Sequence, residues 1–267
     1  MSLIYNATFD SQTRILSLLD KAGNVISSCG VPSKDVDDIT KPLTFKATQD
    51  GSTVSLKRFN SPYGEFQTSR DGGNTWTNYS IGTAITLNTG EEVSFRAKSD
   101  RTSAQSNNNS FYFEMTGKIE AWHNVMSLYR TNDFATYKSV EEYAFHHLFR
   151  VCTSLTKAPA LPATTLADSC YDHTFLGCES LTKAPELPAT TLADRCYYYM
   201  FSGCKSLKEV RISATTTATS ALYSWLKDVS ATGDFYCNPS ATIFPTGASG
   251  IPANWTRRNI ADYPVTP

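Results

Sequence analysis

The side chains in this sequence that are best suited to chemistry are seven cysteines and four histidines. Five of the cysteines lie between Cys152 and Cys204, and His146, His147 and His173 fall in or beside the same stretch. Thiolates and imidazoles are the ligands that zinc prefers, and a thiolate can also act as a nucleophile. The first question is whether this clustering reflects a reactive site or a structural repeat.

A repeat of 26 residues accounts for the cysteines. Cys152, Cys178 and Cys204 recur at this spacing, and so do Cys170 and Cys196. The same spacing relates Leu155, Leu181 and Leu207, and also Phe149, Phe175 and Phe201. A fixed period of this length predicts stacked repeats, in which the cysteines form two buried columns. The C-x₇-C spacing within a repeat differs from that of zinc sites, so we predict structural cysteines and no catalytic cysteine. A Cys170–Cys196 disulfide is an alternative in an oxidising compartment.

The histidines raise the same question of a reactive site or a structural repeat. His147 and His173 occupy the same repeat position, which would stack them on an outer face, and the third repeat has Tyr199 there. A metal-binding pair is one interpretation, but no acidic residue occupies this position in the third repeat. We therefore predict no metal and no cofactor. G-x-S-x-G, H-E-x-x-H and phosphate-binding glycine motifs are also absent from the sequence, and we assign no catalytic residue.

Within each repeat, the pattern predicts a short strand followed by a short helix. Apolar and polar residues alternate at the end of Leu207-x-x-Val210-x-Ile212, which predicts a short strand with one face toward the core. The segment 194–203 is predicted to be helical, with Asp194 as N-cap and Gly203 as C-cap. Cys196, Met200 and Phe201 then fall on one face, which would pack beneath the strand.

The repeat resembles that of BspA-like leucine-rich-repeat surface proteins of gut bacteria and their phages. The resemblance rests on Cys-Tyr-x-x-Met/Thr-Phe-x-Gly-Cys-x-Ser-Leu, followed in two repeats by Thr-Lys-Ala-Pro-x-Leu-Pro-Ala-Thr-Thr-Leu, and it spans roughly residues 120–258. It implies a leucine-rich-repeat solenoid and a link to adhesion. Only two full repeats and a degenerate third are present, so the flanking segments must cap the stack.

Two surfaces of the repeats are candidates for binding. The outward strand positions carry Lys157, Lys183, Lys208 and Arg211, which would form a basic column for an acidic glycan or protein. Solvated lysines on a short sheet are the alternative interpretation. Tyr198 and Tyr199 are predicted to be displayed, and amphipathic rings of this kind suit stacking against sugars. Tyr171 and Tyr197 share the register of Phe145 and are predicted to be core.

Residues 69–76, SRDGGNTW, fit S-x-D-x-G-x-x-W, which resembles the Asp-box of sialidases and other β-propeller proteins. A sialidase needs several boxes, an arginine cluster and a nucleophilic tyrosine, whereas this sequence has a single box. We therefore predict a tight hairpin in which Asp71 accepts backbone N–H groups and Trp76 packs on the adjacent strand. A glycan-active enzyme remains the alternative.

The first part of the chain reads as two further β units. Residues 1–38 contain short strands at 4–9, 13–19 and 24–28 and resemble the attachment regions of phage fibres. Three short strands need a partner or an oligomer to complete a core. Residues 31–42 form a polar linker. Residues 39–118 contain strands at 43–47, 53–59, 65–69, 84–87, 93–97 and 111–115, which predict an Ig-like β-sandwich. Residues 119–267 are the repeat domain with its C-terminal cap.

The net charge and the fraction of charged residues limit the classes of binding partner that are expected. The net charge is −1 and only 18% of residues are charged, so neither nucleic acid nor a membrane surface is expected. The N-terminus shows no secretory-signal pattern. The fold expected is mainly β: an N-terminal attachment motif, an Ig-like sandwich and a short leucine-rich-repeat solenoid of α+β type.

From these features we predict a non-enzymatic phage virion protein, a head or tail fibre that displays its repeat tip to a host surface. The partners expected are a bacterial surface glycan or protein, and virion structural proteins through residues 1–38. A homo-oligomer is also expected, with a trimer favoured. The location expected is the virion. A BspA-like adhesin on the bacterial cell surface is the alternative.

Overall fold

The computed structural model describes residues 6–10, 15–19, 22, 25–30, 37–59, 65–101 and 111–263. This part of the chain is mainly β, as predicted, and its helices are two short 3₁₀ helices, η1 (Val125–Leu128) and η2 (Ile260–Asp262). Within it, no helix is long and apolar enough to cross a membrane. The chain forms two compact units, Met1–Asp37 with Tyr263–Pro267, and Asp38–Asp262.

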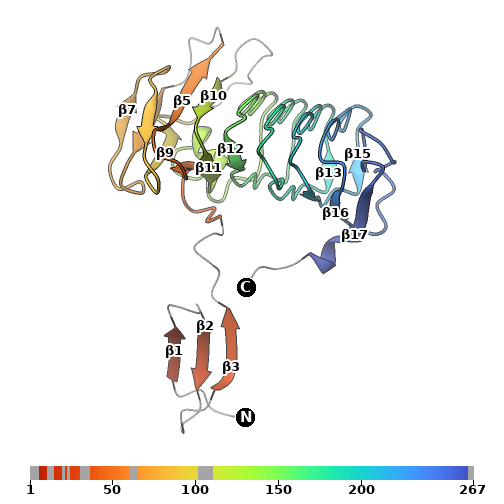
Figure 1. The fold of residues 1–267 in the computed structure, drawn as a ribbon, viewed down its shortest axis with the longest axis horizontal. Helices are drawn as coiled ribbons and strands as arrows, with labels where there is room; N and C mark the ends of the chain where they lie inside the picture. The colour runs from red at the N-terminus through yellow and green to blue at the C-terminus, as the bar shows by residue number, and fades with distance from the viewer. Residues whose placement is uncertain are drawn as a thin grey trace. The chain divides into compact units, whose positions relative to one another are not determined.

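The first unit contains a three-stranded antiparallel sheet in the order β1-β2-β3 (Figure 1). Its strands are β1 (Asn6–Asp10), β2 (Ile15–Leu19) and β3 (Val25–Gly30). They coincide with the expected strands to within two residues at each end. The linker expected at 31–42 lies in part outside the described residues, which resume at residue 37.

The second unit begins with two sheets. Their strands are β4 (Thr44–Ala47), β5 (Ser52–Arg58), β6 (Phe66–Ser69), β7 (Thr77–Tyr79), β8 (Ile85–Leu87), β9 (Glu92–Ala97), β10 (Phe111–Thr116), β11 (Ile119–Trp122) and β12 (Leu155–Lys157). The sheet orders are β10-β5-β8 and β12-β11-β4-β9-β6-β7. Phe45 and Phe95 of the larger sheet contact Phe113 of the smaller one, with ring centroids 4.6 and 5.3 Å apart. The inward positions of both sheets therefore share one core.

The Asp-box forms the turn between β6 and β7. Asp71 accepts hydrogen bonds from the Thr75 amide at 2.9 Å and from the Thr75 and Ser69 hydroxyls at 2.6 Å each. Gly72 and Gly73 have φ of 71° and 97°, a region that glycine enters without steric cost. Trp76 donates to the Gly73 carbonyl at 2.8 Å and lies under the Arg96 guanidinium of β9. These contacts close a hairpin turn.

The boundary expected between residues 118 and 119 falls between β10 and β11. β11 pairs antiparallel with β4 and parallel with β12, so the larger sheet continues from the first sheets into the repeats. Phe113 of β10 also donates its amide to the Leu148 carbonyl at 2.7 Å. The two-sheet region thus covers the first end of the repeat stack.

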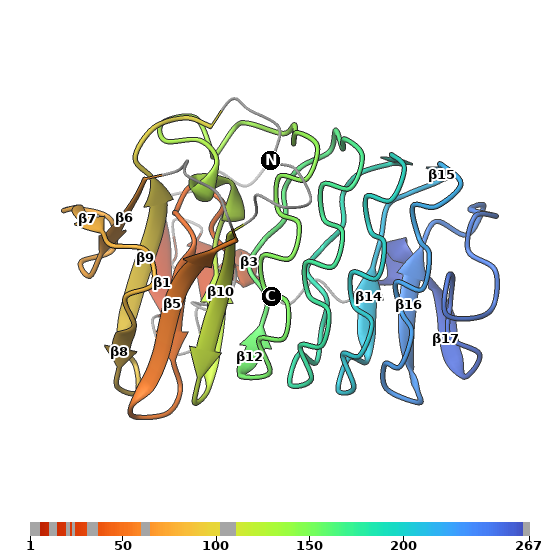
Figure 2. The same ribbon diagram turned by 90° about the horizontal axis from the view of Figure 1, so that it is seen from above.

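The repeats form stacked coils: coil 1 (143–168), coil 2 (169–194) and coil 3 (195–220), seen side by side in Figure 2. Their short strands and those that follow are β13 (Thr191–Leu192), β14 (Glu209–Arg211), β15 (Thr216–Thr217), β16 (Gly233–Cys237) and β17 (Trp255–Asn259). β13 pairs parallel with β15, and β14-β16-β17 form a parallel sheet. Trp225 and Trp255 donate indole N–H groups to carbonyls of Gly250 and Ser230, which ties down the far end of the stack.

The helix predicted at 194–203 is wrong. The structure has consecutive turns there, and likewise at 142–151 and 168–177; we call residues 142–151, 168–177, 194–203 and 219–228 the turn segments. In the first three turn segments every second amide bonds to the next coil, as Tyr197 and Tyr199 do to the Ala221 and Tyr223 carbonyls at 3.0 Å each. The amides between them bond three residues back within the segment. Because neighbouring coils satisfy half of the backbone donors, the segment has no need of helical hydrogen bonds.

The core of the coils is a set of stacked columns. Phe113, Phe149, Phe175 and Phe201 stack with ring centroids 5.5, 5.2 and 5.4 Å apart. Beside them, the thiols of Cys152, Cys178 and Cys204 each donate to the carbonyl of a phenylalanine 29 or more residues earlier, at 3.0–3.1 Å. The six cysteines with described side chains are buried free thiols, Cys170 and Cys196 among them.

Candidate functional site: an aromatic strip across four turn segments

Aromatic side chains follow the outer face of the turn segments from one coil to the next. We call this set the aromatic strip; it consists of His146 and His147 in coil 1, His173 in coil 2, Tyr198 and Tyr199 in coil 3, and Tyr223 in the segment after it. Each coil contacts the next through these rings, with centroid distances of 5.0 Å from His147 to His173 and 5.2 Å from His173 to Tyr199. The strip is therefore continuous across the stack.

The backbone of the turn segments explains why these residues point outward. His147, His173 and Tyr199 share one repeat position and have φ of 63°, 56° and 49°. Positive φ recurs every fourth residue along each segment, and the side chains at this position leave the core, whereas those two residues earlier enter it. Tyr171 and Tyr197, which precede this position by two residues, are each 1% exposed and belong to the core.

The tyrosine end of the strip presents the larger exposed ring surface. Tyr223 is 50% exposed, and its ring is nearly parallel to that of Tyr198, with a centroid distance of 5.1 Å and an interplanar angle of 15°. The Arg195 guanidinium lies over the Tyr198 ring, 4.3 Å from its centroid. Burial raises the pKa of Tyr198 above its ordinary value, so its hydroxyl remains protonated at neutral pH.

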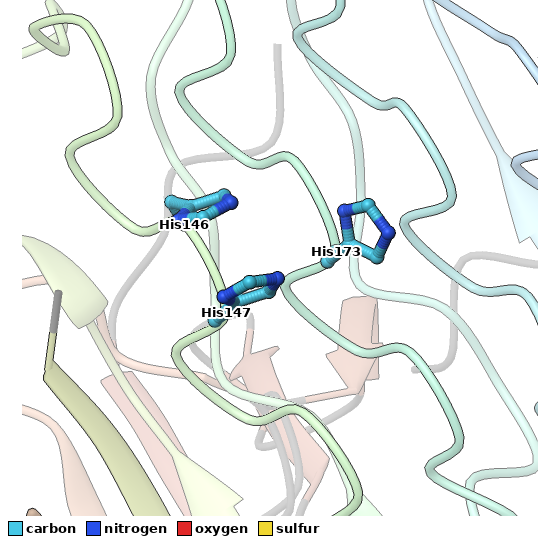
Figure 3. A group of neighbouring side chains, drawn as sticks. All are labelled: His146, His147 and His173. Carbon is cyan, nitrogen blue, oxygen red and sulfur yellow. The ribbon is translucent and has the colours of Figure 1, made fainter. Parts of the chain in front are cut away.

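The histidine end consists of His146, His147 and His173, whose side chains are close to one another (Figure 3). His146 is 5% exposed, and its Nδ1 has no hydrogen-bond partner among the described residues. One ring nitrogen from each of His146, His147 and His173 can be chosen so that all three lie within 4.8 Å of one another. Burial is the largest cause that lowers the pKa of His146 to about 4 and that of His147 to about 3; His173 and Arg150 act in the same direction, and Asp172 opposes them. These two imidazoles are therefore neutral at neutral pH and keep a lone pair for a ligand.

A carboxylate supports the third histidine. Asp172 is 1% exposed, and its carboxylate contacts Nδ1 of His173. Arg195 of coil 3 donates to the same carboxylate at 3.2 Å, so the buried charge of Asp172 is paired. A proton on Nδ1 of His173 leaves Nε2 as the acceptor and directs its lone pair away from Asp172.

A pocket of about 600 Å³ lies beside coil 1 and shares His147 with the strip. Its walls come from β5, β10 and the first turn segment, and include Phe59, Tyr112, Arg150 and Val151. The rings of Phe59 and Tyr112 stack with centroids 4.6 Å apart, and Lys57 and Glu114 form an ion pair of 3.5 Å at the wall. A groove with aromatic walls and a few charged groups has the composition of a small-ligand site.

The basic residues predicted to form a column lie elsewhere on the coils, at the strand positions. Lys183 contacts Glu209 at 2.9 Å and Arg211 contacts Glu186 at 3.2 Å. Lys157 lies 3.8 Å from the centre of the Trp122 ring, and Lys208 is exposed. Because carboxylates of the neighbouring coils accompany two of these charges, the column presents mixed charge instead of a uniform positive surface.

The buried cysteines are poor candidates for catalysis. Burial raises the pKa of the Cys152, Cys178 and Cys204 thiols above the ordinary value, and the same cause raises that of Cys170 and Cys196. A nucleophilic cysteine needs the opposite shift.

Part of the aromatic strip was predictable from the sequence. The repeat position identified His147, His173 and Tyr199, and the run of tyrosines pointed to Tyr198. His146 was missed as a member, because a helix would turn it about 100° away from His147. In the turn segment the two rings lie 3.7 Å apart. The adjacency of the two histidines was the available signal.

No protein-family model, curated protein or solved structure matches this chain.

Proposed function

We propose that this chain is a non-enzymatic display protein that binds a host-surface glycan or protein through the aromatic strip, and that it serves as a head or tail fibre of a phage virion. The observation that carries the proposal is the exposed tyrosine end of the strip. Tyr198 and Tyr223 form a parallel pair at 5.1 Å, and Tyr223 is 50% exposed. Rings with one apolar face and a polar hydroxyl stack against sugars at little cost in conformational entropy.

The architecture supports this role. The stack of coils with a 26-residue repeat is proposed to be a leucine-rich-repeat solenoid, and the two sheets before it an Ig-like sandwich that acts as a spacer. The separate unit of β1, β2 and β3 is proposed as the attachment motif, since three short strands need a partner or further copies to complete a core. In a fibre, one unit is expected to attach to the virion and the other to bind the host surface.

Two observations favour the strip over the basic column as the binding surface. Lys183 and Arg211 each have a carboxylate partner at 2.9 and 3.2 Å, and an acidic ligand would have to compete with these carboxylates. Three positions of the strip are held by the repeating backbone of the turn segments, which fixes the spacing of the rings. Prearranged rings lose little freedom on binding.

The same geometry would serve a bacterial surface adhesin of the BspA-like type. The two roles differ in assembly and source rather than in the binding surface. A fibre is expected to be a homo-oligomer, with a trimer favoured, held together through residues 1–38. An adhesin of this type is expected to remain monomeric when those residues are removed.

Binding to whole bacteria tests the proposal. The fluorescently labelled full chain is incubated with a panel of gut bacteria, and bound cells are counted by flow cytometry. We expect at least one strain to bind, and Tyr198→Ser with Tyr223→Ser to abolish that binding while the far-ultraviolet circular dichroism stays unchanged. Turnover of sialylated or other glycans by the purified chain would contradict the non-enzymatic role. Unchanged binding by the tyrosine variant would contradict the role of the strip.

A further inference from the structure

We propose that His146, His147 and His173 bind a single divalent transition-metal ion of the Zn²⁺ class, and that the ion joins coil 1 to coil 2. This goes beyond surface binding by the tyrosines and does not depend on it. Three imidazoles from two neighbouring coils converge, and their ligand nitrogens lie within 4.8 Å of one another (Figure 3).

The unpartnered nitrogen of His146 is the first argument. Its Nδ1 is buried, and it has no hydrogen-bond partner among the residues that the structure describes. A buried polar atom without a partner costs free energy, so it needs a compensating ligand. Its imidazole lies 3.7 Å from that of His147 and 6.3 Å from that of His173, centroid to centroid. A metal ion bound through Nδ1 of His146 would satisfy this atom.

The carboxylate behind His173 is the second argument. Asp172, 1% exposed, contacts Nδ1 of His173. Carboxylates in this position are the usual outer partners of metal-bound histidines, since they fix the ring and raise the basicity of the other nitrogen. Arg195 closes this outer layer by donating to the second carboxylate oxygen at 3.2 Å.

The spacing suits a small ion after a modest adjustment. Zn–N bonds of roughly 2.0–2.1 Å in a tetrahedron place the ligand nitrogens about 3.3 Å apart. The nitrogens here lie within 4.8 Å of each other, so rotations that move the rings by about 1 Å would close the site. Three imidazoles leave a fourth position for water or for an oxygen atom of a bound partner. An all-imidazole set favours zinc, copper or nickel over calcium or magnesium.

Tag-free full-length protein is titrated with Zn²⁺ in a calorimeter, and the thermal midpoint is recorded with Zn²⁺ and with EDTA. We expect one ion per chain and a midpoint that rises with Zn²⁺ and returns with EDTA. Co²⁺ in place of Zn²⁺ should give the visible absorption of a four-coordinate site.

The key variant is His147→Asn with His173→Asn. Both residues have positive φ, and asparagine tolerates that backbone conformation better than alanine does. We expect Zn²⁺ affinity to fall by more than about 10-fold, because loss of an outer partner of a metal ligand alone costs about 10–100-fold and this variant removes two of the three ligands. The matched control is His123→Asn: His123 also has positive φ, at 68°, but lies outside the cluster. Absence of Zn²⁺ uptake by the wild type, or equal uptake by the double variant and the wild type, would overturn the proposal.

Discussion

Val151 is a β-branched residue in a left-handed backbone conformation, with φ of 60°. The equivalent residues of the next two coils are Gly177 and Gly203, with φ of 71° and 74°. A branched side chain at such a φ is strained by about 1–2 kcal/mol, which glycine avoids. Val151 is also 59% exposed, so it gains little from burial in return.

Replacing the valine by glycine, and an equivalent glycine by valine, should change the free energy of unfolding in opposite directions. Val151→Gly is expected to raise the free energy of unfolding by about 0.5–1 kcal/mol, because the strain relieved exceeds the added freedom of the unfolded chain. Gly177→Val is expected to lower it by about 1–2 kcal/mol. A Cβ at Gly177 would meet its nearest atoms at 3.8 Å, an ordinary contact, so the cost expected is that of the positive φ. Urea unfolding measures both, and a destabilised Val151→Gly would contradict the account.

Asp71 is held in its ionised form by its hydrogen bonds in the turn between β6 and β7. The Ser69 hydroxyl, followed by the Thr75 hydroxyl and amide, holds the pKa of Asp71 well below its ordinary value of 3.8. A carboxyl whose pKa is lower in the folded state stabilises the fold above its unfolded pKa, and this contribution fades as the pH falls further. Asp71→Ala should therefore lower the thermal midpoint at pH 7 and leave surface binding intact. The gap to the wild type should narrow below about pH 4; a gap independent of pH would refute the mechanism.

Among the secondary-structure elements, the turn segments show where prediction failed and why. Cys196, Met200 and Cys204 are buried at intervals of four residues, and Tyr197 and Phe201 repeat the interval beside them. An interval of four is close to the 3.6-residue period of a helix, so the apolar pattern fits a helix and a series of four-residue turns alike. The distinction depends on hydrogen bonds to neighbouring coils, which a single segment of sequence does not reveal.

The strands were more predictable, because their signal is local. The alternation at 43–47, 53–59 and 93–97 corresponds to β4, β5 and β9 to within one residue at each end. The three-residue strand β7 was not predicted, since Thr77–Tyr79 is too short to show alternation. Of the strip, Tyr199 and the His147–His173 pair followed from repeat position and Tyr198 from the run of tyrosines, whereas the approach of His146 depended on the turn geometry.

The phenylalanine column is the element on which stacking most depends. Phe175 is 0% exposed and lies between Phe149 and Phe201, at 5.2 and 5.4 Å. Phe175→Ala should lower the free energy of unfolding by about 3–5 kcal/mol, through lost burial and the cavity it leaves. Denaturant unfolding followed by tryptophan fluorescence measures this. A loss below about 1 kcal/mol would mean that the coils do not pack through this column.

For the whole molecule, the continuous core predicts how the second unit unfolds. Phe45, Phe113 and Phe149 link the two sheets to coil 1, so residues 38–262 should unfold in one cooperative transition. The first unit is separate from this core. The assembly role proposed for it can therefore be tested by deletion.

Deletion of residues 1–37 should leave the thermal midpoint of the second unit unchanged and convert an oligomer into a monomer. Light scattering coupled to size-exclusion chromatography gives the mass before and after deletion. An oligomer that survives the deletion would place the assembly contacts elsewhere. A full chain that is already monomeric would favour the adhesin over the fibre.

The aromatic strip, and not the basic column, is proposed to recognise the host surface. The most direct measurement is the dissociation constant for surface polysaccharide or protein extracted from a bound strain. Three proteins are compared: wild type, Tyr198→Ser with Tyr223→Ser, and charge reversal at Lys157, Lys183 and Arg211. Since stacked rings contribute about 1 kcal/mol or more each, we predict at least a 10-fold weaker Kd for the tyrosine variant and little change for the charge variant. The reverse order would contradict the account.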